Sequence, residues 1–355
     1  MISPIPIAKP LIDQEETKAV NKAIKSGWIT MGKKVKEFER KICTLTKSKY
    51  SVAVNNGTSA LDAILKALSI GPGDEVIVPS LTYISTSNVV LYNGAKLVLC
   101  DNDPDTFNVT VKNIEKKITK KTKAFITVDL KGTPVDYAKF KKLGRKYKIY
   151  FISDSAESFG AKYKKKIVGT QADIHSFSFF ANKNITTGEG GAVTTNNKKI
   201  YEKLKVIRNQ GQDKRYNHIV LGNNYRMTDI CASIGITQLK KINKIIKQKN
   251  ELAKTYTKEL KKNKNITPPF IPHYSTQPSW YMYSIKVKKE IRGKLIKFLS
   301  KHKIDTRLSF PPVHIQPYYV KKFKFKRNQF LNAINSYDSF IDIPIWYGMK
   351  KKNQN

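Results

Sequence analysis

One lysine stands out among the many in this sequence. Lys183 ends the aromatic-rich segment 176–183 (SFSFFANK) and runs into the glycine turn 188–191 (GEGG). Most lysines lie on the surface, but a lysine that follows a buried strand into an apolar pocket can lose its proton and attack aldehydes. Lys183 is therefore the first candidate for covalent chemistry.

Two further groups could act together with this lysine. Asp154 closes the apolar run 149–152, and a buried carboxylate there needs a cationic or N–H partner, such as a protonated pyridine nitrogen. Residues 55–60 (NNGTSA) open a helix whose N–H groups, with the hydroxyls of Thr58 and Ser59, would cradle a phosphate. A phosphate cradle, a carboxylate and a lysine are the three groups that bind pyridoxal phosphate and make it an electron sink.

Other common sites lack support in the sequence. No P-loop occurs, and no G-x-G-x-x-G follows a strand, so ATP and dinucleotide binding are not indicated. Cys43, Cys100 and Cys231 are far apart and form no C-x-x-C pair, which argues against a zinc site or a disulfide framework. No apolar run approaches the roughly 18 residues that span a bilayer. We expect no metal, no membrane partner, and a cytoplasmic location, or a host cytoplasm for a viral or parasite protein.

The candidate residues sit on an alternating pattern of strands and helices. Apolar strand-like runs are predicted at 75–79, 96–100, 124–129, 149–154 and 175–180. Helical patterns between them are typical of βαβ units and a mostly parallel sheet. In such sheets ligands bind beyond the carboxyl ends of the strands. Asp129, Asp154 and Lys183 follow three of these runs, so they are expected to meet at one crevice.

The remaining chain predicts a second, smaller unit. A helix is expected at 59–69, a strand at 192–195, a helix at 198–208, and a long helix from 228 to about 262 that is interrupted or bent near its middle. Prolines between 268 and 278 mark a seam. A strand at 280–287 and a helix at 292–301 follow. We predict a large cofactor-binding α/β domain, 1–245, with segment 1–30 near the active site, and a small α+β domain, 246–355.

The charge of the chain first suggests a polyanionic partner. Lys and Arg number 66 against 27 Asp and Glu, a net charge of +39. Only eight of the basic residues are arginines, the better residue for phosphate and base recognition, and the lysines are scattered in pairs such as Lys33-Lys34. A general bias of the coding sequence toward lysine, with the charges on solvent-exposed faces, explains this pattern. We therefore expect no nucleic-acid partner, and keep a non-catalytic polyanion-binding protein as an alternative.

Five motifs in order make the sequence recognisable. They are NGTSAL (56–61), GPGDEVIVP (71–79), DSAES (154–158), FSFFANK with GEGG (177–191), and NYRMT (224–228). Over about residues 7–319 the chain resembles the pyridoxal-phosphate-dependent nucleotide-sugar aminotransferases of the DegT/DnrJ/EryC1/StrS family, nearest the perosamine and viosamine synthase branch. The resemblance implies fold type I, with a mostly parallel seven-stranded sheet flanked by helices and a smaller α+β C-terminal domain.

The resemblance assigns the chemistry to matching positions. Lys183 matches the Schiff-base lysine, which also carries protons between the cofactor and the substrate carbon. Asp154 matches the carboxylate that keeps the pyridine nitrogen protonated. Glu157 stands where many relatives have Gln, at the position that reaches the phenolic oxygen. A branch that dehydrates the sugar has His in place of this lysine, so Lys183 favours transamination.

Other matching positions bind the cofactor or the substrate. Phosphate contacts are matched by Gly57, Thr58, Ser59 and Ser178. Tyr83 matches the aromatic residue that stacks on the ring, and Asn224 matches a residue lent by the second subunit, which implies a homodimer with active sites at the interface. Each of these residues also has an ordinary capping or packing interpretation.

Substrate positions match less closely. The segment with Trp28 and Thr30 resembles one that approaches the sugar, and His314 lies in a loop like one near the nucleotide; packing is an equal alternative for Trp28 and His314. Relatives often read His-Leu-Tyr-Gly where this chain has residues 129–132 (DLKG), which makes Lys131 the candidate contact there. The closing acidic segment and helix are replaced by lysines 350–352. His175 is expected to be a satisfied core histidine.

The implied reaction is a ping-pong amino transfer. L-glutamate donates the amine, and a nucleotide-linked keto-deoxyhexose accepts it. The expected acceptor is a 4-keto-6-deoxyhexose, giving a 4-amino-4,6-dideoxy sugar of the viosamine or perosamine type. A 3-keto-sugar aminotransferase stays open as an alternative, as does the nucleotide.

Overall fold

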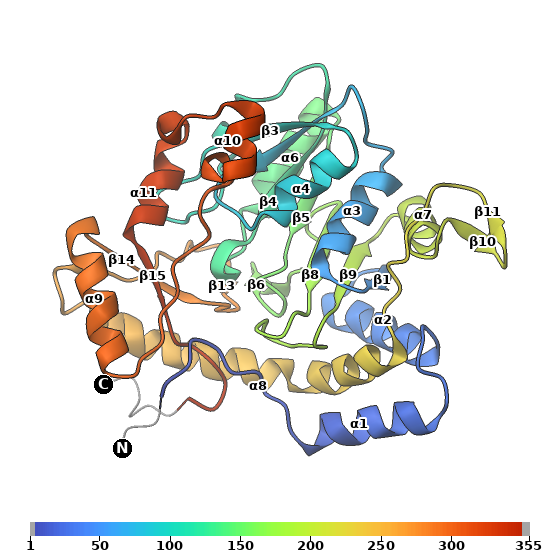
Figure 1. Ribbon diagram of the computed structural model, residues 1–355, viewed down its shortest axis with the longest axis horizontal. Coiled ribbons are helices and arrows are strands. Elements are labelled where there is room, and N and C mark those ends of the chain that lie inside the picture. The colour runs from blue at the N-terminus through green and yellow to red at the C-terminus, as the bar shows by residue number, and fades with distance from the viewer. Residues whose placement is uncertain (1–3, 350–355) are drawn as a thin grey trace.

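A seven-stranded sheet forms the centre of the computed structural model, which describes residues 4–349 (Figure 1). In spatial order its strands are β1 (Tyr50–Val54), β9 (Gly191–Thr195), β8 (Ile174–Ser178), β5 (Tyr150–Asp154), β4 (Thr122–Val128), β2 (Glu75–Pro79) and β3 (Lys96–Cys100). Only β9 runs antiparallel to its neighbours, and the pairs from β8 to β3 are all parallel. The predicted α/β fold with a mostly parallel seven-stranded sheet is confirmed.

Helices cover both faces of this sheet because its strands are apolar on both sides. Strand alternation sends Val76 and Val78 into one core cluster and Ile77 into the other. The first core contains side chains from α3 (Gly57–Ala67), α4 (Ser85–Tyr92) and α7 (Lys198–Arg208). The second contains side chains from α2 (Lys33–Thr46), α5 (Val111–Glu115), α6 (Tyr137–Tyr147) and α8 (Asp229–Leu260). α1 (Gln14–Lys25) packs on α8.

The C-terminal third forms a smaller layer beside the sheet, joined to it by α8. Strand β14 (Tyr283–Val287) pairs antiparallel with β12 (Ile266–Thr267) and β15 (Phe340–Ile343). The helices here are α9 (Lys289–Lys301), α10 (Pro317–Phe323) and α11 (Leu331–Ser339). α8 places Ile236 in the core beneath the large sheet and Leu252 in the core of this layer. It runs from 229 to 260 as one helix without the expected interruption, so it crosses the predicted domain boundary at 245.

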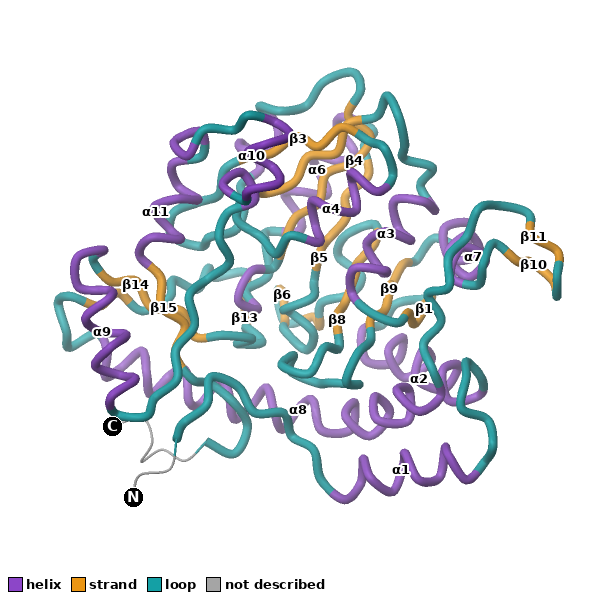
Figure 2. Tube along the Cα trace, in the orientation of Figure 1, coloured by secondary structure: helices purple, strands orange, loops and turns teal. Residues whose placement is uncertain are grey.

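Short strands complete the described chain. β13 (Ser275–Gln277) pairs with β6 (Lys162–Tyr163), which pairs with β7 (Lys166–Ile167). β10 (Gln212–Lys214) and β11 (Asn217–His218) form a hairpin that projects away from the body (Figure 2). Between residues 4 and 349, no helix is long and apolar enough to cross a membrane. The lysines predicted to replace the closing helix lie outside the described residues.

Candidate active site

A cavity of about 510 Å³ lies beyond the carboxyl ends of β4, β5 and β8, next to the start of α3. The fold therefore places it where parallel sheets bind ligands. Its size suits a small-molecule cofactor with part of a substrate. The predicted residues that line it are Gly57, Thr58, Tyr83, Asp154, Glu157, Ser178 and Lys183.

The start of α3 forms one end of the cavity. Asn56 caps this helix, with its side-chain oxygen accepting the Ser59 N–H at 2.8 Å. A Cβ on Gly57 would lie 2.9 Å from the Ser178 Cβ, so glycine is needed for the helix to approach β8 this closely. The Thr58 hydroxyl is 2.7 Å from that of Ser85. These hydroxyls beside a helix N-terminus suit an anion, although Ser59 itself is buried and does not line the cavity.

Asp154 ends β5 at the floor of the cavity, and it is 6% exposed. One carboxylate oxygen accepts the Thr86 hydroxyl at 2.8 Å, and the other accepts the Ala156 N–H at 3.2 Å. Burial raises the pKa of this carboxyl, while the Thr86 bond and the Lys183 charge oppose the rise. No basic side chain among residues 4–349 forms an ion pair with Asp154. A buried carboxylate without a cation suits a ligand that brings a protonated ring nitrogen.

Lys183 follows β8 and extends into the same cavity. Its Nζ lies 3.8 Å from a Glu157 carboxylate oxygen and 4.0 Å from the centre of the Tyr281 ring, and the side chain is 13% exposed. Burial lowers the pKa of this amine, and the charges of Lys131 and Arg307 lower it further, against the opposing effect of Glu157 and Asp154. The environment favours the neutral amine, the form that attacks an aldehyde.

Lys131 lies behind the cavity wall. Its ammonium group forms a buried 2.8 Å ion pair with Asp342 of β15, and its backbone N–H donates to Glu157 at 2.7 Å. The predicted substrate contact is therefore already engaged, and Lys131 does not line the cavity. In the structure, the Lys131 backbone N–H holds the Glu157 carboxylate in place.

Four other predicted residues lie outside the cavity of this chain. Trp28 is 59% exposed and donates its ring N–H to the Met31 carbonyl, and the Thr30 carbonyl accepts the Asp229 N–H. His314 is fully buried, with its ring nitrogens at hydrogen-bond distance from the Ser80 hydroxyl and the Arg327 carbonyl. Asn224 is exposed and forms a backbone bridge with Asn209. Their substrate and cofactor roles stay predictions.

Asp129 and His175 share a buried network apart from the cavity. The His175 ring is within 2.9 Å of the Ser155 hydroxyl and accepts two backbone N–H groups, and burial lowers its pKa to about 3. Ser155, Ser158 and Tyr137 donate to the Asp129 carboxylate, whose pKa burial raises to about 6. His175 is a hydrogen-bonded core residue, as predicted. Asp129 does not line the cavity, contrary to the expected convergence of strand-end residues.

Several cavity residues were missed by sequence reasoning. Tyr281, Arg307 and Phe310 line the cavity from the C-terminal third of the chain, and Phe310 packs edge-on against Tyr83. None lies in a motif with a chemical signature. Contacts between segments far apart in the chain bring this region to the sheet, among them the pairing of Asp342 with Lys131 and with the Arg307 backbone.

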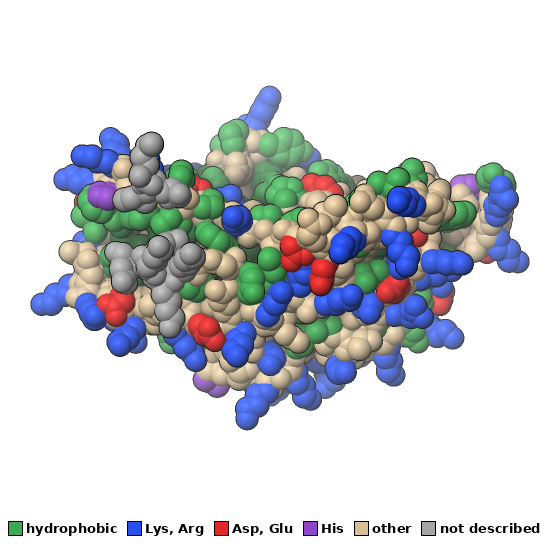
Figure 3. All heavy atoms as spheres, turned by 90° about the horizontal axis from the view of Figure 1, so that it is seen from below, with side chains coloured by type: hydrophobic (Ala, Val, Ile, Leu, Met, Phe, Trp, Pro, Cys, Tyr) green, Lys and Arg blue, Asp and Glu red, His purple; other side chains and the backbone are tan. Residues whose placement is uncertain are grey.

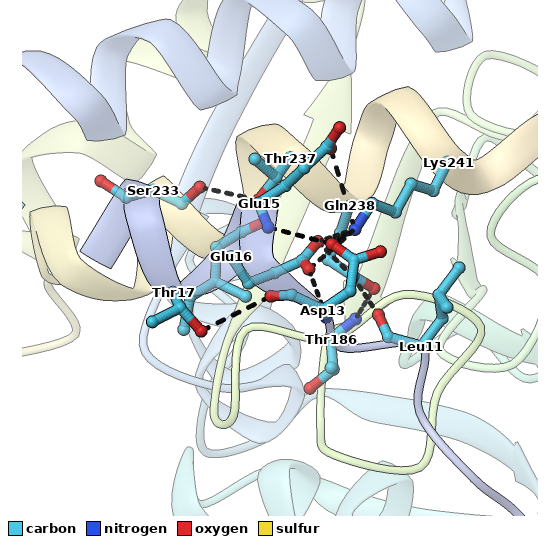
Figure 4. Close-up of polar contacts among 11 residues, drawn as sticks. Leu11, Asp13, Glu15, Glu16, Thr17, Thr186, Ser233, Thr237, Gln238 and Lys241 are labelled. Carbon is cyan, nitrogen blue, oxygen red and sulfur yellow. Dashed lines mark hydrogen bonds and ion pairs between the residues drawn. The ribbon is translucent and has the colours of Figure 1, made fainter. Parts of the chain in front are cut away.

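A polar cluster on α8 holds the loop that follows Lys183 (Figure 4). Gln238 accepts the Thr186 N–H and donates to Glu16 at 2.8 Å. The buried Lys241 ammonium lies 2.7 Å from both Glu16 oxygens and 2.8 Å from Asp13. Because Thr186 is three residues after Lys183, this network fixes the loop and α1 to the same helix.

Lys249 on α8 is the second anchor of this loop. Its Nζ donates to the Asn184 side chain at 2.7 Å, and it is 5% exposed. No carboxylate of the described chain forms an ion pair with it, and burial lowers its pKa to about 7. An ionised lysine here carries an uncompensated desolvation cost.

We predict that Lys249 makes folding more favourable as pH rises. Its pKa is about 7 in the folded chain and near 10.4 when unfolded, so between these values the unfolded chain holds one more proton. Relative to Lys249→Met, the unfolding free energy of the wild type should rise by about 2 kcal/mol between pH 7 and 9. Denaturant titrations at these pH values measure the difference. Lys254→Met, on the same helix, is the control, and parallel pH dependence of wild type and Lys249→Met would contradict the prediction.

Comparisons with known proteins agree with this geometry. The sequence model described as the DegT/DnrJ/EryC1/StrS aminotransferase family matches residues 10–355. GDP-perosamine synthase of Escherichia coli O157:H7 is 41% identical over 327 residues, covering 90% of this chain and 88% of that protein. DesV of S. venezuelae, solved in complex with a ketimine intermediate, has a TM-score of 0.94 at 28% identity, over 99% and 96% of the two chains. Spr1654 of Streptococcus pneumoniae, solved in a PLP-form, has a TM-score of 0.91 at 30% identity, over 99% and 96%.

Proposed function

Because the chain belongs to the DegT/DnrJ/EryC1/StrS aminotransferase family, we propose that it transfers an amino group from L-glutamate to a nucleoside-diphosphate 4-keto-6-deoxyhexose, with pyridoxal phosphate as cofactor. The product is a 4-amino-4,6-dideoxyhexose nucleotide of the perosamine or viosamine type, for glycan biosynthesis. One observation carries this proposal: Lys183, Asp154 and the start of α3 meet in a single cavity. The similarity to a GDP-perosamine synthase supports the 4-amino product.

The cavity residues fit the cofactor at three points. The N–H groups at Gly57 and Thr58, with the Ser178 hydroxyl, would hold its phosphate, in a space that a side chain at position 57 would fill. Asp154 would face its ring nitrogen, and Lys183 would react with its aldehyde. When bound, the cofactor supplies an electron sink for the charge left on the amino-acid or sugar carbon.

Each side chain then has a defined task. The neutral Lys183 amine takes the proton from the carbon that bears the transferred nitrogen and returns it on the other side of the reaction. The Asp154 carboxylate keeps a proton on the ring nitrogen, and Thr86 holds that carboxylate in place at 2.8 Å. Glu157, fixed by the Lys131 N–H, lies beside the lysine. The aromatic side chains of Tyr281 and Phe310 line the cavity and limit water at the reacting atoms.

The working unit in this proposal is a homodimer. The hairpin segment 212–221 projects from the body and exposes Tyr216 (77%), Ile219, Val220 and Leu221 (88%) (Figure 1). An apolar projection of this kind is costly in water and is typical of a contact with another chain. Asn224, next to this hairpin, would then contact the cofactor phosphate of the second copy. Sedimentation equilibrium should give twice the 40.5 kDa of one chain, and a mass of one chain would contradict the dimer.

The excess of lysine does not require a nucleic-acid partner. Lys and Arg side chains are spread over the face seen from below, among neutral and acidic ones, rather than gathered in one patch (Figure 3). A dispersed positive field can instead speed the encounter with an anionic sugar nucleotide. This effect predicts an association rate for the sugar nucleotide that falls as salt is added, and a rate independent of salt would contradict it.

The decisive experiment offers both keto sugars to the same protein. Purified protein with pyridoxal phosphate and L-glutamate is incubated with a 4-keto-6-deoxy or a 3-keto-6-deoxy nucleotide sugar, and the products are identified by mass spectrometry. The proposal requires the amino sugar from the 4-keto substrate only when glutamate is present. An amino sugar from the 3-keto substrate alone would establish the alternative, and no product from either would contradict both.

A further inference from the structure

Arg307 reaches the cavity from the small C-terminal layer. Its backbone pairs with Asp342 of β15, through N–H to carbonyl bonds of 3.1 and 2.8 Å in the two directions. Its side chain lines the cavity together with Lys183, Tyr281 and Phe310. Because these backbone bonds hold Arg307 in place next to β15, its guanidinium can reach only this part of the cavity.

The Arg307 guanidinium has no partner among residues 4–349. It forms no ion pair and donates no hydrogen bond within this part of the chain. The carboxylate next to it in the structure, Asp342, is occupied by Lys131 and Ser284. Two other arginines, in contrast, form ion pairs within the described chain: Arg208 is bonded to Glu39, and Arg327 to Asp338.

Arg307 and Lys183 line the same cavity, and the charge of Arg307 acts on the reacting amine. Its charge is one of the influences that lower the pKa of Lys183, and it also lowers that of Tyr281. Lys131, the other cation of this region, is neutralised by Asp342. Arg307 is therefore the one unneutralised cation beside Lys183 among the described residues that line the cavity. A planar guanidinium with five donors is well matched to a carboxylate.

The chemistry of the two substrates decides which anion belongs next to Lys183. In an α-amino acid, the carboxylate is bonded to the carbon that carries the transferred nitrogen. In a nucleotide sugar with a carbonyl at C4, the diphosphate is attached at C1, on the opposite side of the ring. Of the two substrates, only the amino donor therefore brings an anion next to the reacting carbon.

We propose that Arg307 is the specificity-determining residue for the amino donor and binds its α-carboxylate through the guanidinium. This inference rests on the proposed function, because it assumes that an amino acid and a keto sugar use the same cavity in turn. It assigns Arg307 to the first half of the reaction only. The sugar half requires no carboxylate at this position.

The test separates the two halves of the reaction. Protein loaded with pyridoxal phosphate is mixed with L-glutamate or with 4-aminobutyrate, which lacks only the α-carboxylate, and the change of cofactor absorbance is followed in single turnovers. Protein loaded with pyridoxamine phosphate is mixed with the 4-keto nucleotide sugar. Wild type, Arg307→Gln and Arg307→Lys are compared with Arg327→Gln, which removes an arginine paired outside the cavity.

Arg307→Gln is expected to need about 10- to 100-fold more glutamate for half-maximal rate, a much larger change than in its reaction toward 4-aminobutyrate. Arg307→Lys keeps the charge without the planar guanidinium, so the glutamate concentration that it needs should lie between those of wild type and Arg307→Gln. In Arg307→Gln, any effect of the lost charge on the Lys183 amine should appear equally in both half-reactions, so the loss toward glutamate should exceed the change in the sugar half-reaction by about 10-fold or more. Arg327→Gln should match wild type in both half-reactions.

Two results would overturn the inference, and they differ from failure of the proposed function. Equal dependence on glutamate in Arg307→Gln and wild type would show that the guanidinium does not bind the donor. A selective loss in the sugar half-reaction would assign it to the diphosphate instead. A wild type whose cofactor absorbance does not respond to glutamate would contradict the proposed function itself.

Discussion

Lys183→Ala is expected to lose amino transfer by about 10,000-fold or more, the largest effect of any single substitution in this chain. The substitution removes the nucleophile and the proton carrier at once, and no second lysine lines the cavity among the described residues. The phosphate cradle and Asp154 remain, so the variant should still bind the cofactor without a covalent link. It should therefore lack the visible absorbance that the wild type shows after incubation with pyridoxal phosphate.

The covalent link can be tested apart from activity. Treatment of the loaded wild type with borohydride, followed by peptide mass mapping, should place one cofactor on the peptide that contains Lys183. Lys249→Met is the matched control, since Lys249 is the other buried lysine with a lowered pKa next to the same loop. That variant should be labelled like the wild type. Labelling of Lys183→Ala at an equal level would show that another amine binds the cofactor.

The sequence predicted the half of the site that depends on local pattern. Apolar runs define strands, and a parallel sheet collects whatever follows their carboxyl ends. For this reason Asp154 after β5, Lys183 after β8 and the start of α3 were placed correctly in one cavity. The strands β2 and β3 and the helix α7 have the predicted bounds, because their ends coincide with turn and capping residues.

The other half of the site depends on contacts between segments that are distant in the sequence, and no periodic pattern of residues predicts such contacts. Lys131 was interpreted as a substrate contact, but it is paired with Asp342, 211 residues away. Sequence position gave no reason to connect Arg307 with Lys183, because they meet in one cavity only through the tertiary packing of the C-terminal third, including the Arg307–Asp342 pairing. Buried lysines are equally hidden: Lys241 and Lys249 look like their many exposed counterparts until α8 is packed against the loop.

The net charge of the chain was a poor indicator of its function for the same reason. Carboxylates are scarce in this chain, and several are buried where they hold the structure together, such as Glu16 with Lys241 and Asp342 with Lys131. The chemistry depends on which few charges are enclosed by the fold. The surface excess of lysine contributes at most a long-range field.

Asp154→Asn is expected to lower the rate of amino transfer by about 100- to 1,000-fold while the protein still binds pyridoxal phosphate through Lys183. Asparagine keeps the size of the side chain and can still accept the Thr86 hydroxyl, so the fold at the end of β5 should persist. A neutral amide cannot keep a proton on the ring nitrogen. Without that proton the ring accepts less of the charge that forms when the Lys183 amine removes the substrate proton.

A carboxylate at the other end of β5 provides the control. Asp173 accepts the Phe151 N–H at 3.0 Å and lies away from the cavity, so Asp173→Asn removes a negative charge from the same strand region without touching the site. Single-turnover rates with L-glutamate should fall in Asp154→Asn and stay near wild type in Asp173→Asn. Reconstitution with a cofactor analogue whose ring nitrogen is permanently methylated, and therefore always positive, should restore part of the lost rate in Asp154→Asn. Similar losses in both variants, or no rescue by the analogue, would mean that Asp154 acts through the stability of the strand and not through the charge of the ring.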